Sequence, residues 1–162
     1  MVTISGFPSL LRSATATSLL VRLADMDNDG KTDFVVAQLN GTPLNVYPNT
    51  TSLPGSSISI GSVISVSASN TIHDIAIGDL DANGTQDVAL ATNGNAIEIF
   101  SNAIPSLGNF EAAFQVATSH ATHSVGLWDL NADGKLDLIG GYTFTKNGGV
   151  FENGHKGLSI YD

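Results

Sequence analysis

Three acidic loops carry the residues of this chain that are best suited to chemistry. The first reads Asp25-Met26-Asp27-Asn28-Asp29-Gly30-Lys31-Thr32-Asp33, and its pattern returns over residues 79–87 and 129–137. Oxygen-bearing side chains occupy loop positions one, three, five and nine, and glycine occupies position six. Such oxygens, converging around a sharp glycine turn, suit a hard cation such as calcium. The backbone carbonyl at position seven (Lys31, Thr85 or Lys135) is a further expected ligand.

The composition places most of the acidity in these loops. Ten of the fifteen acidic residues are loop aspartates, and the formal net charge is −9. Three bound divalent cations, one in each loop, would offset six of those nine charges. The six basic residues are spread along the chain, which argues against a nucleic-acid-binding or anionic-membrane surface. The absence of cysteine excludes disulfides and thiolate metal sites.

The remaining composition favours one folded, strand-rich domain. Apolar residues make up 42% of the 162 positions and charged residues 13%, which is typical of a folded chain. Serine, threonine, asparagine, glycine, valine and isoleucine dominate, and this mixture favours strands and turns. The longest apolar runs are too short to span a bilayer, so we expect no membrane insertion. Residues 1–4 lack the features of a signal peptide, so we expect a removed leader or a longer parent polypeptide.

The residues around the loops predict the strands that position them. Apolar residues lie four and two positions before each loop, at Val21 and Leu23, Ile75 and Ile77, and Val125 and Leu127. This alternation predicts a strand with one buried face. Continuous apolar runs follow the loops at residues 34–37, 88–91 and 138–141. These runs predict strands that are buried on both faces.

Two further strands are expected in each repeat. An Asn/Gly turn leads to a third strand at residues 44–47, 97–100 and 149–151, with an asparagine two positions past its aromatic residue (Asn49, Asn102 and Asn153). A fourth strand is expected over residues 58–66 and 111–117, and is barely begun at residues 158–161. The first loop aspartates lie 54 and then 50 residues apart. Four short antiparallel strands in a repeat of this length are typical of a β-propeller blade.

The expected organisation is therefore all-β, with three blades at residues 19–70, 71–122 and 123–162. In each blade the calcium loop joins the first strand to the second. The third blade lacks most of its outer strand, and open edges invite pairing. We expect residues 1–18 to supply a strand that completes a blade, in this chain or in a neighbouring copy.

The pattern D-x-[DN]-x-[DN]-G-x-x-D between two apolar strands resembles the FG-GAP/VCBS repeat of integrin-α-like β-propellers. The resemblance covers all three repeats, roughly residues 19–162. It implies structural calcium sites, with binding surfaces for proteins or glycans elsewhere on the propeller. By this resemblance the ligand positions are Asp25, Asp27, Asp29, Lys31 and Asp33; Asp79, Asp81, Asn83, Thr85 and Asp87; and Asp129, Asn131, Asp133, Lys135 and Asp137.

An EF-hand and a simple turn both account for the loops less well. An EF-hand requires flanking helices and a glutamate at position twelve, where this chain has Val36, Leu90 or Gly140. Turn formation alone would explain one loop, but it does not explain four oxygen positions kept in register three times. The first loop has four aspartates, whereas the second and third have three and an asparagine. We therefore expect the first loop to bind calcium most tightly.

Residues near the loops have simpler expected roles. His73 and His123 each precede a loop by six positions, and we expect them to pack or hydrogen-bond at a strand start, with a transition-metal site as the alternative. Trp128 is expected to pack between blades, with sugar stacking as the alternative. Lys31 and Lys135 are expected to be solvated. The recurring aromatic residues are expected in the core: Tyr47, Phe100 and Phe151.

Three classes of function follow. The first is a non-catalytic, secreted or cell-surface module that calcium stabilises and that binds a partner or self-assembles into a homo-oligomer or filament. Assembly is expected because three repeats fall short of the about four to eight blades that close a propeller. The second class is a carbohydrate-binding lectin-type propeller, and a fragment of a larger integrin-like adhesion propeller is a variant of the first. An enzyme is not expected, because the chain offers no catalytic triad, cofactor loop or carboxylate pair outside the loops.

Overall fold

The structure is a computed structural model that describes residues 18–53, 55, 57–103, 110–111, 113–118, 120–144 and 155–161. All regular elements in these ranges are strands: β1 (Leu19–Ala24), β2 (Asp33–Gln38), β3 (Pro43–Tyr47), β4 (Ile64–Ser67), β5 (Ile72–Gly78), β6 (Asp87–Thr92), β7 (Ala96–Phe100), β8 (Phe114–Ala117), β9 (Thr122–Trp128), β10 (Asp137–Phe144) and β11 (His155–Tyr161). The expectation of an all-β chain is confirmed. No helix long and apolar enough to cross a membrane occurs among the described residues.

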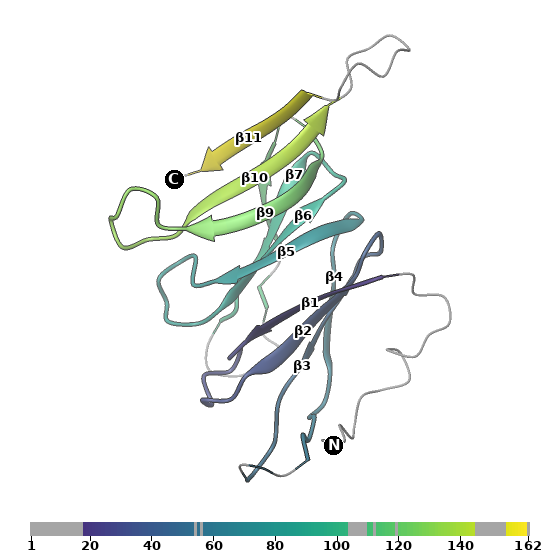
Figure 1. The fold of residues 1–162 in the computed structure, drawn as a ribbon, viewed down its shortest axis with the longest axis vertical. Helices are drawn as coiled ribbons and strands as arrows, with labels where there is room; N and C mark the ends of the chain where they lie inside the picture. The colour runs from purple at the N-terminus through teal and green to yellow at the C-terminus, as the bar shows by residue number, and fades with distance from the viewer. Residues whose placement is uncertain are drawn as a thin grey trace.

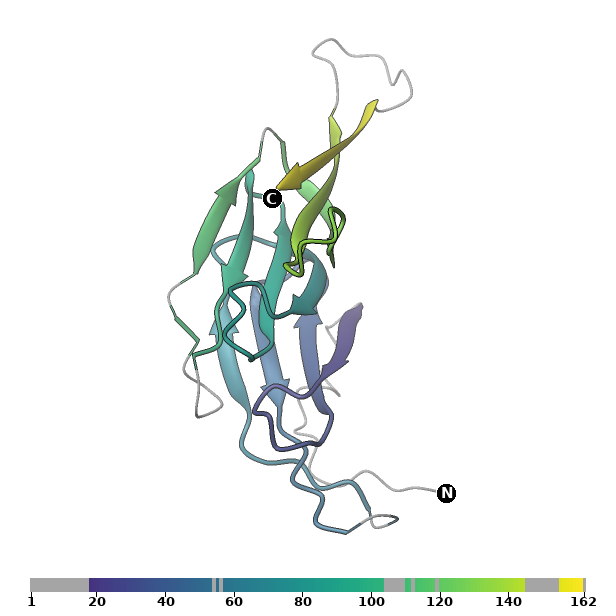
Figure 2. The same ribbon diagram turned by 90° about the vertical axis from the view of Figure 1, so that its left-hand side faces the viewer.

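The strands form three antiparallel sheets, one for each repeat. Sheet 1 has the order β1-β2-β3-β4, sheet 2 has the order β5-β6-β7-β8, and sheet 3 has the order β9-β10-β11. The sheets follow one another along the molecule, and their first strands, β1, β5 and β9, run in the same direction (Figure 1). The three acidic loops therefore lie on one side of the molecule, and that side faces the viewer in Figure 2.

The second strands are the most buried, as their continuous apolar sequences predict. Every residue of β6 is buried, and so are four of the six residues of β2. Both strands pair on two sides, β2 with β1 and β3, and β6 with β5 and β7. The loops that precede β2 and β6 are therefore held against the most buried strand of their sheets.

Two apolar junctions hold the sheets together. Between sheets 1 and 2, Val35 and Leu44 pack with Ile75 and Val88 as part of a larger cluster. Each of these four residues is at most 1% exposed. Between sheets 2 and 3, Ala89 and Ile97 pack against Leu138. The same register positions of successive repeats thus make equivalent faces, one toward the preceding sheet and one toward the following sheet.

Burial in the first repeat differs from the expectation. Val21 and Leu23 are 47% and 62% exposed, whereas their equivalents in the second repeat are Ile75, which is 1% exposed, and Ile77, which is partly buried. These positions face the preceding sheet, and no sheet precedes sheet 1 in the described chain. Trp128 is also exposed, at 68%, because it lies on a face of its sheet that has no neighbouring sheet. It occupies the position of Gly78, which faces the following sheet, and no described sheet follows sheet 3. The expectation that Trp128 packs between blades is therefore wrong within the described chain.

The expected fourth strand at residues 158–161 is wrong, because these residues belong to β11 and pair directly with β10 as a third strand. β10 continues through Tyr142, Thr143 and Phe144, whose aromatic and β-branched types favour a strand where the other repeats turn. Its hairpin partner therefore begins later in the chain. The third strand expected at residues 149–151 lies outside the described residues, as do Phe151, Asn153 and residues 1–17 of the expected N-terminal segment.

The fourth strands of the first two repeats begin later than expected, at Ile64 and Phe114. Before them the pairing is reduced to single bridges, Asn49 with Ile60 and Asn102 with Phe110. Gly61 and Ala113 are of residue types that are depleted in strands. The ladder is interrupted where these residue types occur.

Candidate metal centres

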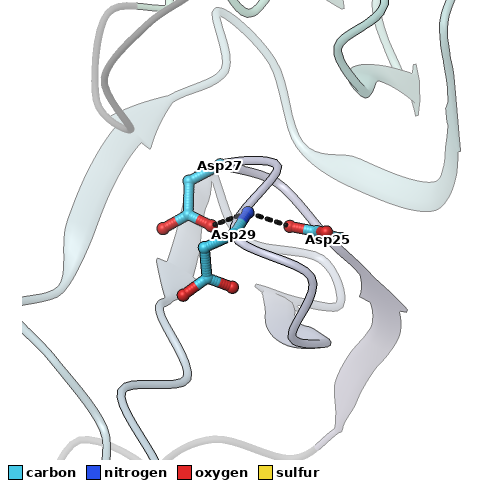
Figure 3. A group of neighbouring side chains, drawn as sticks. All are labelled: Asp25, Asp27 and Asp29. Carbon is cyan, nitrogen blue, oxygen red and sulfur yellow. Dashed lines mark hydrogen bonds between the residues drawn. The ribbon is translucent and has the colours of Figure 1, made fainter.

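Each acidic loop is shaped by the carboxylate at its first position. In the first loop, Asp25 accepts hydrogen bonds from the backbone N–H groups of Asp29 (3.1 Å) and Gly30 (2.9 Å). Asp27 accepts a second bond from the Asp29 N–H, at 3.2 Å. Figure 3 shows these two carboxylates on either side of the Asp29 backbone. Asp79 and Asp129 make the equivalent bonds in their own loops, at 2.9–3.1 Å. All three repeats therefore fold the loop in the same way.

The turn itself requires unusual backbone conformations at positions four and six. The position-six glycines Gly30, Gly84 and Gly134 have φ of 83°, 89° and 89°, a region that glycine enters without steric cost. Position four is also left-handed, with φ of 57° at Asn28, 58° at Ala82 and 62° at Ala132. These two turns fold the loop so that side chains from alternate positions share one side.

The ninth-position aspartate joins the loop to the sheet. Asp33 accepts hydrogen bonds from the N–H of Met26 at 2.8 Å and from the N–H of Asn49 at 2.8 Å. Asp87 does the same with Leu80 and Asn102, both at 2.8 Å. In the third loop, Asp137 accepts from Leu130 at 2.7 Å. The position-nine carboxylate thus fixes the start of its own loop.

Burial perturbs these carboxylates. Asp33 and Asp87 are fully buried, and this burial raises the pKa of each, against the lowering effect of its backbone hydrogen bonds. The carboxyl groups of Asp33 and Asp87 therefore bind a proton more tightly in the folded state than in the unfolded chain. In consequence, the ionised forms present at neutral pH reduce the stability of the fold. A bound cation would offset this cost.

Carboxylates converge in the first two loops. One carboxylate oxygen from each of Asp25, Asp27 and Asp29 lies within 4.8 Å of the other two, and the same holds for Asp79, Asp81 and Asp87. Burial, together with the charges of Asp25 and Asp29, raises the pKa of Asp27. Among the described residues, these are the two groups of three acidic side chains placed to share a cation. In the third loop the amide of Asn131 occupies position three, where the other loops have an aspartate.

Lys31 is tied to the first loop and not simply solvated. Its ammonium forms an ion pair with Asp29, and this hydrogen bond lowers the pKa of Asp29. The expectation of a solvated lysine holds for Lys135, which is exposed. At the same position of the second loop, Thr85 donates from its hydroxyl to the carbonyl of Asn102 at 2.6 Å. The position-seven side chain therefore contacts different partners in the first and second loops, as expected if it is not the ligand.

The donors present fit a calcium ion. They are carboxylate, amide and carbonyl oxygens, which are the hard ligands that calcium takes, and the three loops contain no histidine or cysteine. In the first loop the structure brings together positions one, three and five, and in the second loop it brings together positions one, three and nine. Asp33 lies outside the converged group of the first loop. Its two oxygens are held by Met26 and Asn49.

The structure also reveals contacts that the sequence pattern did not predict. Asn28 reaches from the first loop to the carbonyl of Gly84 in the second, at 2.9 Å, and Asn102 reaches the carbonyl of Met26 at 2.7 Å. The recurrence of an asparagine after each third strand was a visible signal for Asn102. For Asn28 the only signal was that the equivalent residues are alanines.

The two histidines near the loops have a packing role. The rings of His73 and His123 are stacked, with centroids 4.6 Å apart and planes 5° apart. The Nδ1 atom of His73 also lies 3.0 Å from the carbonyl oxygen of Thr122. Each histidine is the extra residue at an irregularity in its strand pairing. These contacts agree with the expected packing and hydrogen-bonding role at a strand start.

Repeated antiparallel sheets, each with an oxygen-rich loop between its first and second strands, define a class of β-repeat proteins. A family model for the FG-GAP-like repeat matches residues 25–90 and 79–140. These matches span more than half of the chain, and the chain belongs to the FG-GAP-like repeat family. No match is found among curated proteins.

Proposed function

We propose that this chain is a non-catalytic, extracellular module whose sheets are propeller blades stabilised by calcium, about one ion in each loop. The converged carboxylates of the first two loops support the proposal, because few basic groups balance them. Calcium would neutralise these charges and fix the turn between the first and second strands. Extracellular modules commonly use weak calcium sites of this kind, since calcium is abundant outside cells.

We also propose that the module assembles with further copies of itself through its end faces. The observation that carries this proposal is a strip of exposed apolar side chains along β1, with Leu19, Val21 and Leu23 at 39%, 47% and 62% exposure. Val21 and Ile75 are equivalent positions, and Ile75 is buried against the preceding sheet. A blade from a second copy would bury the strip in the way that sheet 1 buries Ile75. Head-to-tail contacts of this type give a closed ring or an open filament.

The mass of the particle in calcium and in chelator tests both parts of the proposal. In calcium, light scattering should give a multiple of 16.7 kDa, and chelation should lower both the mass and the melting temperature. A 16.7 kDa particle in calcium would overturn the assembly. A melting temperature unchanged by chelation would overturn the structural role of calcium.

A matched pair of variants locates the assembly face. Leu23→Asp places a charge on the β1 strip and should return the particle to a monomer. Phe114→Asp is the control, because Phe114 is 65% exposed and Leu23 is 62% exposed, yet Phe114 lies on β8 of sheet 2. Equal dispersal by both variants would show that the β1 strip is not the contact.

A second candidate function is glycan binding, which the exposure of Trp128 favours. An indole that is 68% exposed beside Asp129 offers an aromatic face and a carboxylate to a sugar. Saturable binding on a glycan array should be lost in Trp128→Ala and largely kept in Trp128→Phe, with unchanged melting temperatures. If Trp128→Ala binds as the native chain does, the sugar does not stack on this residue.

A further inference from the structure

A buried chain of hydrogen bonds joins the first acidic loop to the second across the junction of sheets 1 and 2. Asp33 accepts from the N–H of Met26 (2.8 Å), and the Met26 carbonyl accepts from Nδ2 of Asn102 (2.7 Å). The backbone N–H of Asn102 in turn donates to Asp87 (2.8 Å). None of these four residues is more than 3% exposed. The position-nine carboxylates of two neighbouring loops are therefore connected without an intervening solvated group.

A second bond joins the same two loops nearer the surface. Asn28 donates from Nδ2 to the carbonyl of Gly84 at 2.9 Å. The backbone does not need asparagine here, because Ala82 and Ala132 adopt almost the same φ at this position of the other loops. The distinctive contribution of the Asn28 side chain is thus its bond to the neighbouring loop.

The equivalent asparagine of the first repeat shows which part of this arrangement is specific to the junction. The N–H of Asn49 holds Asp33 at 2.8 Å, just as the N–H of Asn102 holds Asp87. The side-chain amide of Asn49, however, donates to Thr32 of its own loop at 3.1 Å. The backbone of this asparagine therefore serves its own repeat, and only the Asn102 side chain crosses to the preceding one.

These contacts alternate with the expected calcium ligands along the chain. Met26 lies between Asp25 and Asp27, and Asn28 lies between Asp27 and Asp29. In the second repeat, Gly84 directly follows the expected ligand Asn83, and the N–H of Asn102 donates to the expected ligand Asp87. Buried hydrogen bonds are costly to leave unmade, so a change in the first loop that moves the Met26 peptide must also move Asn102 or break the bond.

We propose that calcium binding in the first loop and calcium binding in the second loop are positively coupled through Asn102 and Asn28. The proposal rests on the calcium binding proposed above. An ion in the first loop fixes the Met26 carbonyl, which orders Asn102 and with it Asp87. The second ion then binds a loop whose ordering cost has already been met in part. Because linkage is reciprocal, an ion in the second loop favours the first to the same extent.

A thermodynamic cycle on the full chain measures the coupling. Asp27→Ala disables the first loop without touching the buried chain of bonds. Calcium affinity of the second loop is then read from the backbone amide signals of Gly84 and Thr85 by NMR. In the native background, Asp27→Ala should weaken the second loop by about fivefold or more, which is the lower end of typical coupling.

The same measurement in a second background tests the route. In Asn28→Ala/Asn102→Ala, the added Asp27→Ala should leave the affinity of the second loop unchanged. Asn102→Ala keeps the backbone groups that bind Asp87 and Thr85. Asn49→Ala is the matched control, since its amide bonds stay within the first repeat, and it should preserve the coupling. If the double variant does not fold, Asn28→Ala alone is the substitute, because alanine is the native residue of the other two loops and should be tolerated. It removes the bond to Gly84 and should therefore reduce the fivefold effect.

The outcomes separate this proposal from the one on which it rests. Absence of any calcium-dependent shift in either loop would overturn calcium binding itself. Binding in both loops, with the second loop indifferent to Asp27→Ala, would overturn only the coupling. Coupling that persists in Asn28→Ala/Asn102→Ala would overturn the assigned route.

Discussion

The two junctions between sheets are built differently, although they join equivalent faces of the same repeat. The junction of sheets 1 and 2 is filled by large apolar side chains, among them Met26 and Phe100, at 1% and 5% exposure. At the junction of sheets 2 and 3, small residues allow the backbone to approach closely. A β-carbon on Gly78 would lie 3.1 Å from Leu127, and one on Gly140 would lie 3.0 Å from Ile97. The first junction should thus be sensitive to lost atoms and the second to added atoms.

Polar contacts follow the same division. Across the second junction, the Thr92 N–H donates to the hydroxyl of Thr122 at 3.2 Å, and His73 stacks on His123. Across the first junction, the polar contacts lie at the acidic loops, at Arg22 and at Ile72. The backbone N–H of Ile72 donates to the carbonyl of Gly41 at 2.7 Å, and its carbonyl accepts from the N–H of Asn40 at 3.0 Å. The repeat therefore specifies which faces meet, but it leaves open whether volume or close approach makes the contact.

The largest expected effect is the loss of volume at the first junction. Ile75→Ala removes a side chain that is 1% exposed and should lower the free energy of unfolding by about 3 kcal/mol, as buried truncations do. Val21→Ala is the control at the equivalent position of β1, where the side chain is 47% exposed. It should cost less than about 0.5 kcal/mol in urea unfolding of the monomer. Similar costs for the two variants would contradict the difference between filled and open faces.

Added volume at the second junction should have the next largest effect. In Gly78→Ala the new methyl group would meet Leu136 at 2.6 Å and Leu127 at 3.1 Å. Both neighbours are side-chain ends that can move, so we expect a loss of about 1 to 2 kcal/mol. Gly126→Ala, on the adjacent strand β9, meets nothing within 4 Å and should leave the free energy of unfolding nearly unchanged. A neutral Gly78→Ala would show that the close approach carries no constraint.

The sequence predicts the loops more completely than the junctions, and the reason is the range of the interactions. The turn at Gly30 and the bonds of Asp25 depend on residues at most five positions apart, so the motif contains its own geometry. The bond from Asn102 to Met26 spans 76 positions. No local pattern states which side chain of one repeat will meet a given carbonyl of another. For the same reason, Val21 has the pattern of a buried residue and is nevertheless exposed.

Asp74 takes part in both junctions, and its removal should have an intermediate effect. It accepts from Arg22 at 2.7 Å across the first junction and from the N–H of Val125 at 3.2 Å across the second. Asp74→Ala removes the side-chain acceptor of the Val125 N–H and one of the acceptors of the Arg22 guanidinium, and should cost about 1 to 2 kcal/mol. Amide exchange should accelerate at Val125 as well as at Ile75, whose N–H also binds Asp74. Glu111→Ala, an exposed charge removal, should change neither rate nor stability measurably.

Ile75 lies next to Asp74 on β5, so its exchange reports a local bond, whereas Val125 reports the second junction. If exchange at Val125 stayed unchanged, Asp74 would not contribute to the second junction. Acceleration at Val125, together with a measurable coupling of Asp74 to Arg22, would show that the two junctions share one polar anchor.

The smallest expected effect is that of the ion pair between Arg22 and Asp74. The side chains are 42% and 21% exposed, so solvent screens the attraction, and a double-mutant cycle should give a coupling of about 0.5 kcal/mol. The guanidinium also donates to the carbonyl of Ile75 at 3.0 Å, and the cycle separates that bond from the ion pair. At about 1 M salt, where the Debye length is about 3 Å, the coupling should shrink further. A coupling above about 2 kcal/mol would mean that charge, in addition to apolar volume, holds the first junction. The cost of Ile75→Ala would then no longer account for why sheets 1 and 2 stay together.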